Sequence, residues 1–207
     1  YTRTNATRKK QQTLPNTVAP GAVPHCDDCP LGFVYLTSNG NSPYNAGSLE
    51  PQRRLHSGLA FTLQYTYAHA LDDAILGSAG AGFTAQDWRH LDAERGPSDF
   101  DQRHKLSLTA QYSSQYLFRR NPLLRGWTLT SQLTAASGLP LTPITYLVIP
   151  GTGFTGIRPD LTGAPVALDA DGRFLNSAAF TLPAAGSRGD AGRNSIRGPR
   201  QFSLDAS

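Results

Sequence analysis

Apolar and polar residues alternate with a period of two along three stretches of the chain. In the stretch "GLAFTLQYTYAHALDD" (58–73), one face carries Leu59, Phe61, Leu63, Tyr65 and Tyr67, and the other carries Ala60, Thr62, Gln64, Thr66 and Ala68. The stretches 105–116 and 126–137 repeat the pattern. Because successive side chains of a strand point to opposite faces, the alternation predicts β-strands over 59–71, 105–116 and 127–136. We expect them to be consecutive antiparallel neighbours in one sheet.

Two environments satisfy strands with one apolar and one polar face. In a soluble β-sandwich the apolar face packs on a second sheet, whereas in a membrane β-barrel it faces lipid and the polar face lines the interior. A strand that spans a bilayer needs about 9 to 11 residues, against about 5 to 6 for an average globular strand. The three runs have the longer value, and their polar faces are mostly uncharged Thr, Gln, Ser and Ala. Both features favour the barrel.

The predicted connections are short at one end of the strands and long at the other. Short segments precede Leu59 and join Tyr116 to Trp127, whereas long loops span about 72–104 and 138–200. Outer-membrane barrels have short periplasmic turns and longer outward loops. On this arrangement the aromatic residues fall at the two membrane interfaces, with Trp127, Tyr116 and Phe118 by the turns and Tyr65 and Tyr67 nearer the loops.

Composition limits the remaining classes. The chain has 207 residues, of which 39% are hydrophobic and 16% charged, and it contains no apolar run of the roughly 18 residues that a membrane helix needs. It begins at Tyr1 and has no Met, so we expect a piece of a longer protein. The net charge is +4, yet the only dense basic cluster is 7–10 and no nucleic-acid module accompanies it. Nucleic acid is therefore not an expected partner.

An ordered series of segments also resembles a known family. The segments are "SPYNAGSLEPQRRLHSGLAFTLQYTYAHALDDA", "LDAERGPSDFDQRHKLSLTAQY", "GWTLTSQLTAASGLPLTP", "RPDLTGAP" and "FLNSAAFTLPAAGSRGDAGRNSIRGPRQFSLDAS". From about Ser42 onward they are similar to the later barrel portion of TonB-dependent receptor-like proteins with a carboxypeptidase-regulatory-like domain, of acidobacterial type. The resemblance implies an all-β antiparallel transmembrane barrel of about 22 strands in the complete protein, of which this chain is an incomplete part. It also implies a plug domain, energy supplied through TonB, and a place in the bacterial outer membrane.

The chain departs from the family pattern before His56. Gly47 and Pro51 interrupt the expected strand there, and proline cannot donate to a β-ladder, so either a bulge or a damaged copy is expected. The segment 7–30 is interpreted as a loop. The resulting division is a loop-rich segment with a CxxC motif over 1–43 and a partial barrel over 44–207. Cys26 and Cys29 form the CxxC, which without a second cysteine pair or a redox context favours a small disulfide loop over a metal site.

The chemically most suggestive motif is "ERGPSDFDQRH", which contains Glu94, Arg95, Asp99, Asp101, Arg103 and His104. Paired acids beside a histidine occur in hydrolytic and metal sites. However, the acids alternate with arginines, Pro97 and Ser98 indicate a turn, and no activated nucleophile lies nearby. We therefore interpret the motif as a cluster of salt bridges at the base of a loop. "RGDAGRNSIRGP" (188–199) is interpreted as a tight turn entering the last strand, because no phosphate-loop lysine and serine follow it.

Two functional classes remain. The first is part of the wall and external loops of a TonB-dependent outer-membrane receptor or transporter for an unidentified ligand. Its partners would be outer-membrane lipid, the plug domain and TonB. The alternative is a non-transporting surface-binding barrel or a soluble carbohydrate-binding β-sandwich. No motif supports an enzyme, a cofactor or a metal.

Overall fold

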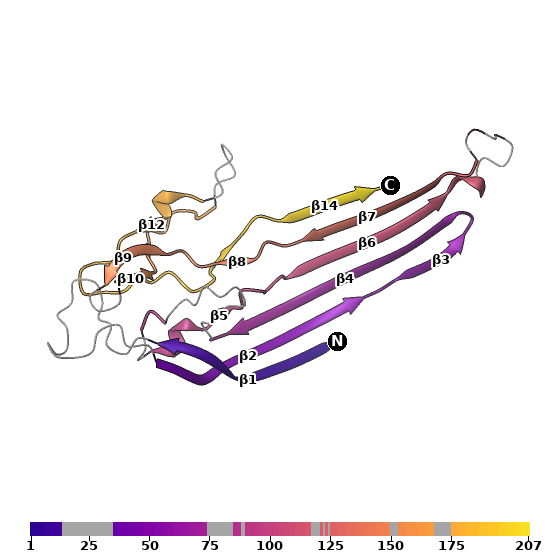
Figure 1. The fold of residues 1–207 in the computed structure, drawn as a ribbon. Helices are drawn as coiled ribbons and strands as arrows, with labels where there is room; N and C mark the ends of the chain where they lie inside the picture. The colour runs from indigo at the N-terminus through magenta and orange to yellow at the C-terminus, as the bar shows by residue number, and fades with distance from the viewer. Residues whose placement is uncertain are drawn as a thin grey trace.

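The computed structural model describes residues 1–13, 35–73, 85–87, 90–116, 121, 123, 125–149, 153–167 and 175–207. Cys26, Cys29 and Phe118 lie outside the described residues. Within them the chain forms one large antiparallel sheet and three small two-stranded sheets (Figure 1). The strands of the large sheet follow the order β1-β2-β4-β6-β7-β14, with β3 and β5 also paired to β4.

The three predicted strands are present and adjacent. They are β4 (Leu59–Asp72), β6 (His104–Ser113) and β7 (Thr128–Ala136), and β4 pairs with β6 and β6 with β7 in antiparallel register. The prediction of consecutive antiparallel strands is confirmed. The second strand ends three residues earlier than expected, because Ser114–Tyr116 turn into a short 3-10 helix, η2.

The register aligns like residues across the sheet. Leu63 pairs with Leu108, Leu108 with Leu133, and Leu133 with Leu204 of β14 (Gln201–Ala206). One residue further along β4, the pairs Gln64↔Ser107, Ser107↔Thr134 and Thr134↔Ser203 form a polar row on the opposite face. A one-residue slip would exchange the two faces, so the alternation fixes this register. One face of the sheet is therefore apolar and the other polar over four strands.

The doubtful strand before His56 is present, with an interruption at the proline. β2 (Tyr35–Leu49) and β3 (Gln52–His56) both pair with β4, and the pairs Leu49↔Tyr65 and Gln52↔Thr62 continue one register. Pro51 lies between them and accepts a 3.0 Å hydrogen bond from the N–H of Leu63 without donating one in return. A register shift follows between Arg53 and His56. The bulge therefore lies after Arg53 and not at Gly47 or Pro51, across which β2 and β3 keep one register.

The expected loop over 7–30 is wrong for its first part. β1 (Thr2–Thr13) pairs antiparallel with β2 through two register shifts, and it forms one edge of the described sheet. Its sequence, "TRTNATRKKQQT", has polar residues on both faces and lacks the alternation by which a strand is recognised. Pairing with β2, rather than a local pattern, makes it a strand.

The turn between β3 and β4 consists of Ser57 and Gly58. Both have positive φ, at 54° and 86°, as the central residues of a type I′ turn require. The turn also packs against β6: the Gly58 carbonyl accepts a 2.7 Å hydrogen bond from Ser113, and a Cβ on Gly58 would lie 2.6 Å from the Ser113 carbonyl oxygen. Glycine is the residue that fits both the backbone conformation and this contact.

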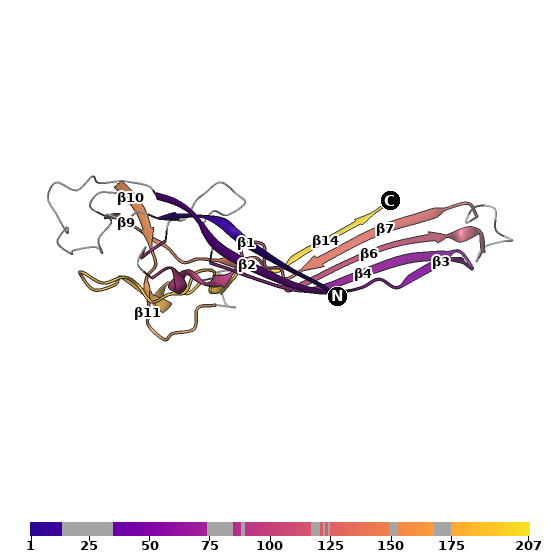
Figure 2. The ribbon, with the colours of Figure 1, turned by 90° about the horizontal axis from the view of Figure 1, so that it is seen from below.

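The described parts of the connections β4–β6 and β7–β14 lie at the other end of the strands, where they contact each other (Figures 1 and 2). The first contains η1 (Leu91–Glu94) and β5 (Gly96–Pro97). The second contains the strand pairs β8 (Pro140–Leu141) with β13 (Ile196–Arg197), β9 (Thr145–Ile149) with β10 (Gly153–Ile157) and β11 (Asp160–Leu161) with β12 (Phe180–Thr181), besides η3 (Ser177–Ala179). The described parts of the two expected loops therefore contain short strands and 3-10 helices.

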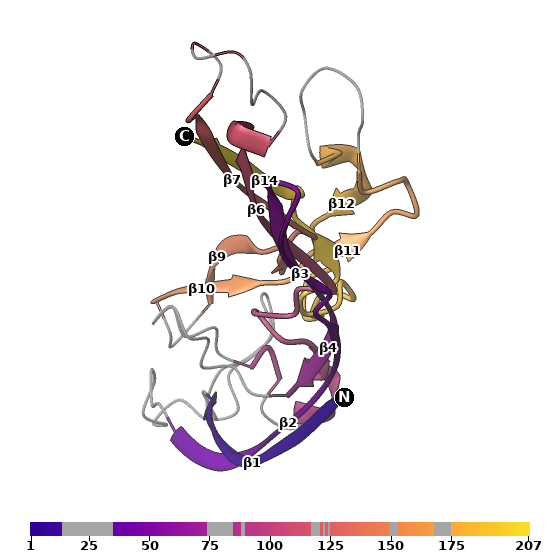
Figure 3. The same ribbon diagram turned by 90° about the vertical axis from the view of Figure 1, so that its right-hand side faces the viewer.

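The strands form a single layer along most of their length (Figures 2 and 3). Within the described residues no second sheet covers the apolar face, and Trp127, Phe202 and Leu204 are 68%, 68% and 59% exposed. The largest fully buried side chains are instead polar: Gln11, Asp101 and Ser98. In a soluble domain the large apolar side chains are buried and the polar ones exposed, so this distribution is the opposite of that of a soluble domain. Among the described residues, no helix has the length and apolar content needed to cross a membrane.

Candidate functional site

Most of the buried polar side chains among the described residues gather, with partly exposed partners, where the two long loops meet the end of the sheet. We call this group the loop-base cluster, and it contains Lys9, His69, Asp72, Gln86, Glu94, Ser98, Asp99, Asp101, Arg103, Thr142, Arg158, Arg193, Asn194 and Arg197. Three of its ion pairs join an acid from the end of β4 or from the first loop to an arginine of the second loop. Within the described part of the chain, no group of three or more His, Cys, Asp or Glu side chains could hold a metal ion.

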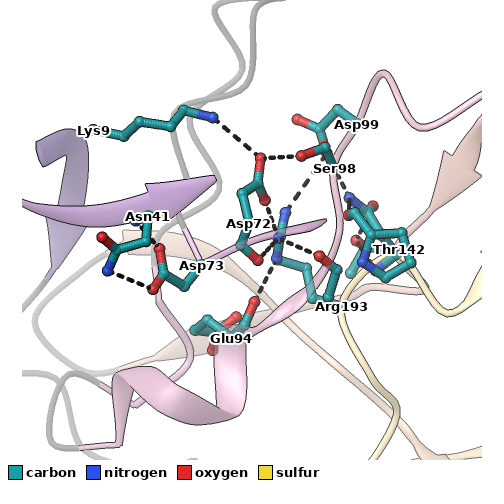
Figure 4. A network of polar contacts seen from close by, with 12 residues as sticks. Lys9, Asn41, Asp72, Asp73, Glu94, Ser98, Asp99, Thr142 and Arg193 are labelled. Carbon is teal, nitrogen blue, oxygen red and sulfur yellow. Dashed lines mark hydrogen bonds and ion pairs between the residues drawn. The ribbon is translucent and has the colours of Figure 1, made fainter. Parts of the chain in front are cut away.

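Arg193 forms the centre of one half of the cluster (Figure 4). Its guanidinium donates to the Asp72 carboxylate, to the Asp72 carbonyl at 2.6 Å and to the Glu94 carbonyl at 2.7 Å. Ser98 Oγ and Lys9 Nζ donate to the other Asp72 oxygen at 2.6 and 3.2 Å. Arg193 thus joins the end of β4, the first loop and the second loop at a single buried point.

Glu94 is paired with a second arginine. Its carboxylate accepts from Arg158 Nη1 at 2.5 Å and from the Gln86 N–H at 2.9 Å. Gln86 in turn accepts from the Arg158 N–H at 2.8 Å and donates to the Gly189 carbonyl at 2.9 Å. The buried Arg158 Nε has no hydrogen-bond partner among the described residues. The contacts of Glu94 hold the segment between β10 and β11 against η1.

Asn194 links the turn at Pro97 to the second loop. It has a positive φ of 54°, and its amide donates to the Pro97 carbonyl at 2.8 Å and to Asp99 at 2.6 Å. Its backbone N–H donates to Thr142 Oγ1 at 2.9 Å. Asparagine tolerates the left-handed conformation better than most residues and supplies these side-chain contacts as well.

Asp101 forms the other half of the cluster. Its side chain is fully buried and accepts hydrogen bonds from the Ala70 N–H at 2.7 Å, from Arg103 at 2.9 Å and from Arg197. His69 Nδ1 lies 3.4 Å from the same carboxylate. Burial acts to raise the pKa of Asp101, but the hydrogen bonds from Arg197, Ala70, Arg103 and His69 together outweigh it. The pKa of Asp101 therefore lies below its ordinary value of 3.8, and the group is charged at neutral pH.

The structure brings together four of the six residues that the motif suggested. Glu94, Asp99, Asp101 and Arg103 belong to the loop-base cluster. The side chain of Arg95 is exposed and forms no ion pair with the described residues. His104 lies apart, at the start of β6, where its Nδ1 is 2.8 Å from the Tyr65 hydroxyl and its ring is 5.2 Å from that of Tyr67.

The arginines of the second loop are the members that the sequence did not reveal. Arg193 and Arg197 belong to "RGDAGRNSIRGP", which was interpreted only as a turn, and Arg158 lies in "RPDLTGAP". A signal existed, because one long loop is rich in acids and the other in arginines. It could not identify the pairs, since the partners are separated by 64 to 121 residues.

The polar face of the sheet forms a groove of about 470 Å³, whose lining includes Phe100 and Gln102 next to Asp99, Asp101 and Arg103 in the sequence. It is lined by Thr4, Ser42, Tyr44, Phe100, Gln102 and Lys105, among others. Phe100 belongs to the first loop, and the Lys9 ammonium lies 5.8 Å from its ring centroid. The groove therefore presents aromatic rings, hydroxyl groups and a cation next to the anchored loops.

Comparison with known families agrees with this geometry. The model of the family described as "Outer membrane beta barrel domain" matches residues 3–207. The chain belongs to this family. The match covers β1 to β14, so the first strand is part of the barrel domain as well. Neither a curated protein nor a solved structure matches the chain.

Membership places the barrel domain in the bacterial outer membrane. The expected fold class, an antiparallel transmembrane β-barrel segment, is confirmed, although the sheet is not closed: its order runs from β1 to β14. The soluble β-sandwich alternative is wrong, because the described residues contain a single-layer main sheet and the family is an outer-membrane one.

Proposed function

We propose that the barrel domain forms part of the wall and external loops of a TonB-dependent receptor that takes up an unidentified ligand. The observation that carries the proposal is the loop-base cluster, which fixes two long outward loops to the barrel rim through ion pairs whose carboxylates are buried. A passive barrel wall does not require such anchoring. A receptor does, because loops held in place lose less conformational entropy when a ligand binds.

The polar face of the sheet supports the same proposal. Its rows of Thr, Gln and Ser suit contact with water or with a plug domain, and its groove opens beside Phe100 of the anchored first loop. A ligand that passes the loops would meet this face next. On the other face, the rows of leucine would contact outer-membrane lipid.

We also propose that this part of the protein catalyses no reaction. Asp72, Glu94 and Asp101 are each engaged by an arginine, so their carboxylate oxygens are occupied by structural contacts. A general acid or base needs a pKa near the working pH, and the lowered pKa of Asp101 lies far from it. The arrangement suits a structural role.

The test is binding of TonB to the complete protein. The complete protein is purified from outer membranes in detergent and mixed with the periplasmic C-terminal domain of TonB. We expect a complex that is lost when a TonB box preceding the barrel is deleted. A protein that folds in the outer membrane but does not bind TonB would instead be a non-transporting surface-binding barrel.

A further inference from the structure

A second groove lies on the apolar face of the sheet, at the end beside the long loops. Its floor is β7, where Ala135 has a small side chain and Ser137 follows the strand. Phe202 of β14 flanks Ala135 on one side and Leu106 of β6 flanks it on the other. Small residues between two large ones leave a groove of about 470 Å³.

The polarity of this groove changes along its length. Phe202, Ala135 and Leu106 line the part toward the middle of the sheet, whereas Arg200 and His104 line the part beside the loops. Arg200 is exposed and has no hydrogen bond or ion pair with the described residues. No acidic residue lines the groove. One end thus suits a hydrocarbon chain and the other an anion.

We propose that this groove binds the lipid A part of lipopolysaccharide, with one acyl chain along β7 and a phosphate group at Arg200. The long loops mark the outward end of the barrel, so the groove lies at the level of the outer leaflet. Lipid A is the phosphorylated lipid of that leaflet. A basic group above an apolar groove at the membrane surface is the arrangement expected for an anionic lipid headgroup. This inference goes beyond the proposed function and does not depend on TonB.

The phosphate contact is tested with bisphosphorylated lipid A added to the complete, delipidated protein in detergent. Bound lipid is measured by native mass spectrometry, with dephosphorylated lipid A and phosphatidylglycerol as competitors. We expect Arg200→Gln to weaken binding about five- to tenfold, the effect typical of one surface cation, and Arg200→Lys to retain most of it. The control is Arg53→Gln. Arg53 is an exposed arginine of β3 that lies opposite Phe61 in the β3–β4 register, at the other end of the sheet, and its replacement should not change lipid A binding.

The acyl-chain contact is tested by filling the groove. Ala135→Leu should abolish retention of lipid A, whereas Ala110→Leu, on the same face beside Phe61, should not. Heat-modified mobility in electrophoresis identifies variants that remain folded. Unchanged binding by the exposed-site variant Arg200→Gln overturns the proposal, and so does equal retention of phosphatidylglycerol and lipid A.

Discussion

A carboxylate removed from water stays charged only where donors surround it, and Asp101 receives donors from three segments of the chain. Ala70 belongs to β4, Arg103 precedes β6 and Arg197 ends β13. Asp72 also accepts hydrogen bonds from distant segments, namely from Lys9 of β1 and from Arg193 of the second loop. Each buried acid therefore connects segments whose buried apolar residues, among those the structure describes, are few and mostly alanine. At the scale of the residue, charge pairing does the work that apolar packing does in a soluble domain.

Replacement of Asp101 tests this connection. Asp101→Asn retains an acceptor for Ala70 but leaves Arg103 and Arg197 without an anion. Because both arginines are about a third exposed and regain water, we expect the free energy of opening of the loop base to fall by only about 1–3 kcal/mol. Hydrogen exchange of the amides near the loop base, measured on the complete protein in detergent, reports it. Asp92→Asn, an exposed acid of the same loop, is the control and should change nothing.

The Asp101 carboxylate also makes the stability of the loop base depend on pH. Its pKa is lower in the folded loop than the ordinary 3.8, so the open loop binds more protons than the folded one. The stabilisation is complete above the ordinary pKa and is lost as the pH falls through the lower, folded pKa. Opening free energies from hydrogen exchange, corrected for intrinsic rates, should decrease from pH 5 to pH 3 in the native protein. An equal decrease in Asp101→Asn would show that another group is responsible.

At the scale of the element, alternation predicted the strands whose two faces meet different surroundings. β4, β6 and β7 have an apolar and a polar face, and the sequence identified them to within a few residues. β1 has no such signal, because it is polar on both faces and becomes a strand through its partner β2. The two-residue strands β5, β8 and β13 also cannot be recognised from the sequence, since they form only where segments distant in the sequence pair with each other. The role of Arg193 depends in the same way on distant contacts, so the sequence did not identify it, although it did identify Glu94, Asp99 and Asp101, which lie close together in one motif.

The type I′ turn provides a prediction about the short connections. Asparagine adopts positive φ more readily than serine, so Ser57→Asn should stabilise the barrel by a few tenths of a kcal/mol, whereas Gly58→Ala should destabilise it by about 1–2 kcal/mol. The second change also places a methyl group 2.6 Å from the Ser113 carbonyl oxygen. Urea unfolding of the complete protein in detergent measures both. Destabilisation by Ser57→Asn together with stabilisation by Gly58→Ala would mean that the turn has another conformation.

The two faces of β4 provide a second prediction at this scale. Leu63 lies in the row with Leu108 and Leu133, and Gln64 lies in the polar row on the other side. In the complete protein, Leu63→Arg should cost about 2–4 kcal/mol and Gln64→Arg much less. A cysteine at each position, labelled in intact outer membranes, separates lipid from a protein interior. Position 63 should react only with a lipid-soluble reagent, and protection of position 63 from both reagents would contradict a lipid-facing surface.

At the scale of the whole molecule, the described sheet is stable only in surroundings that cover it. The rows of leucine are covered by no other described element, and β1 and β14 each have one side without a described partner strand. Exposed strand edges and exposed apolar faces both promote association in water. The polar cluster holds the loops together but shields neither surface. The membrane, and further strands of a closed barrel, would complete the structure.

This leads to a prediction for the 207-residue chain expressed alone. In plain buffer it should aggregate, and detergent should keep it dispersed, because micelles cover the apolar face. Replacement of Leu63, Leu108, Leu133 and Leu204 together by glutamine should reduce the need for detergent, since these residues form one row across four strands. Replacement of Thr62 and Thr109 by glutamine, on the polar face, is the control and should leave that need unchanged. Light scattering during removal of detergent measures the difference. A monodisperse monomer of the native chain that melts sharply and reversibly in plain buffer would mean that the apolar face is covered by the chain itself.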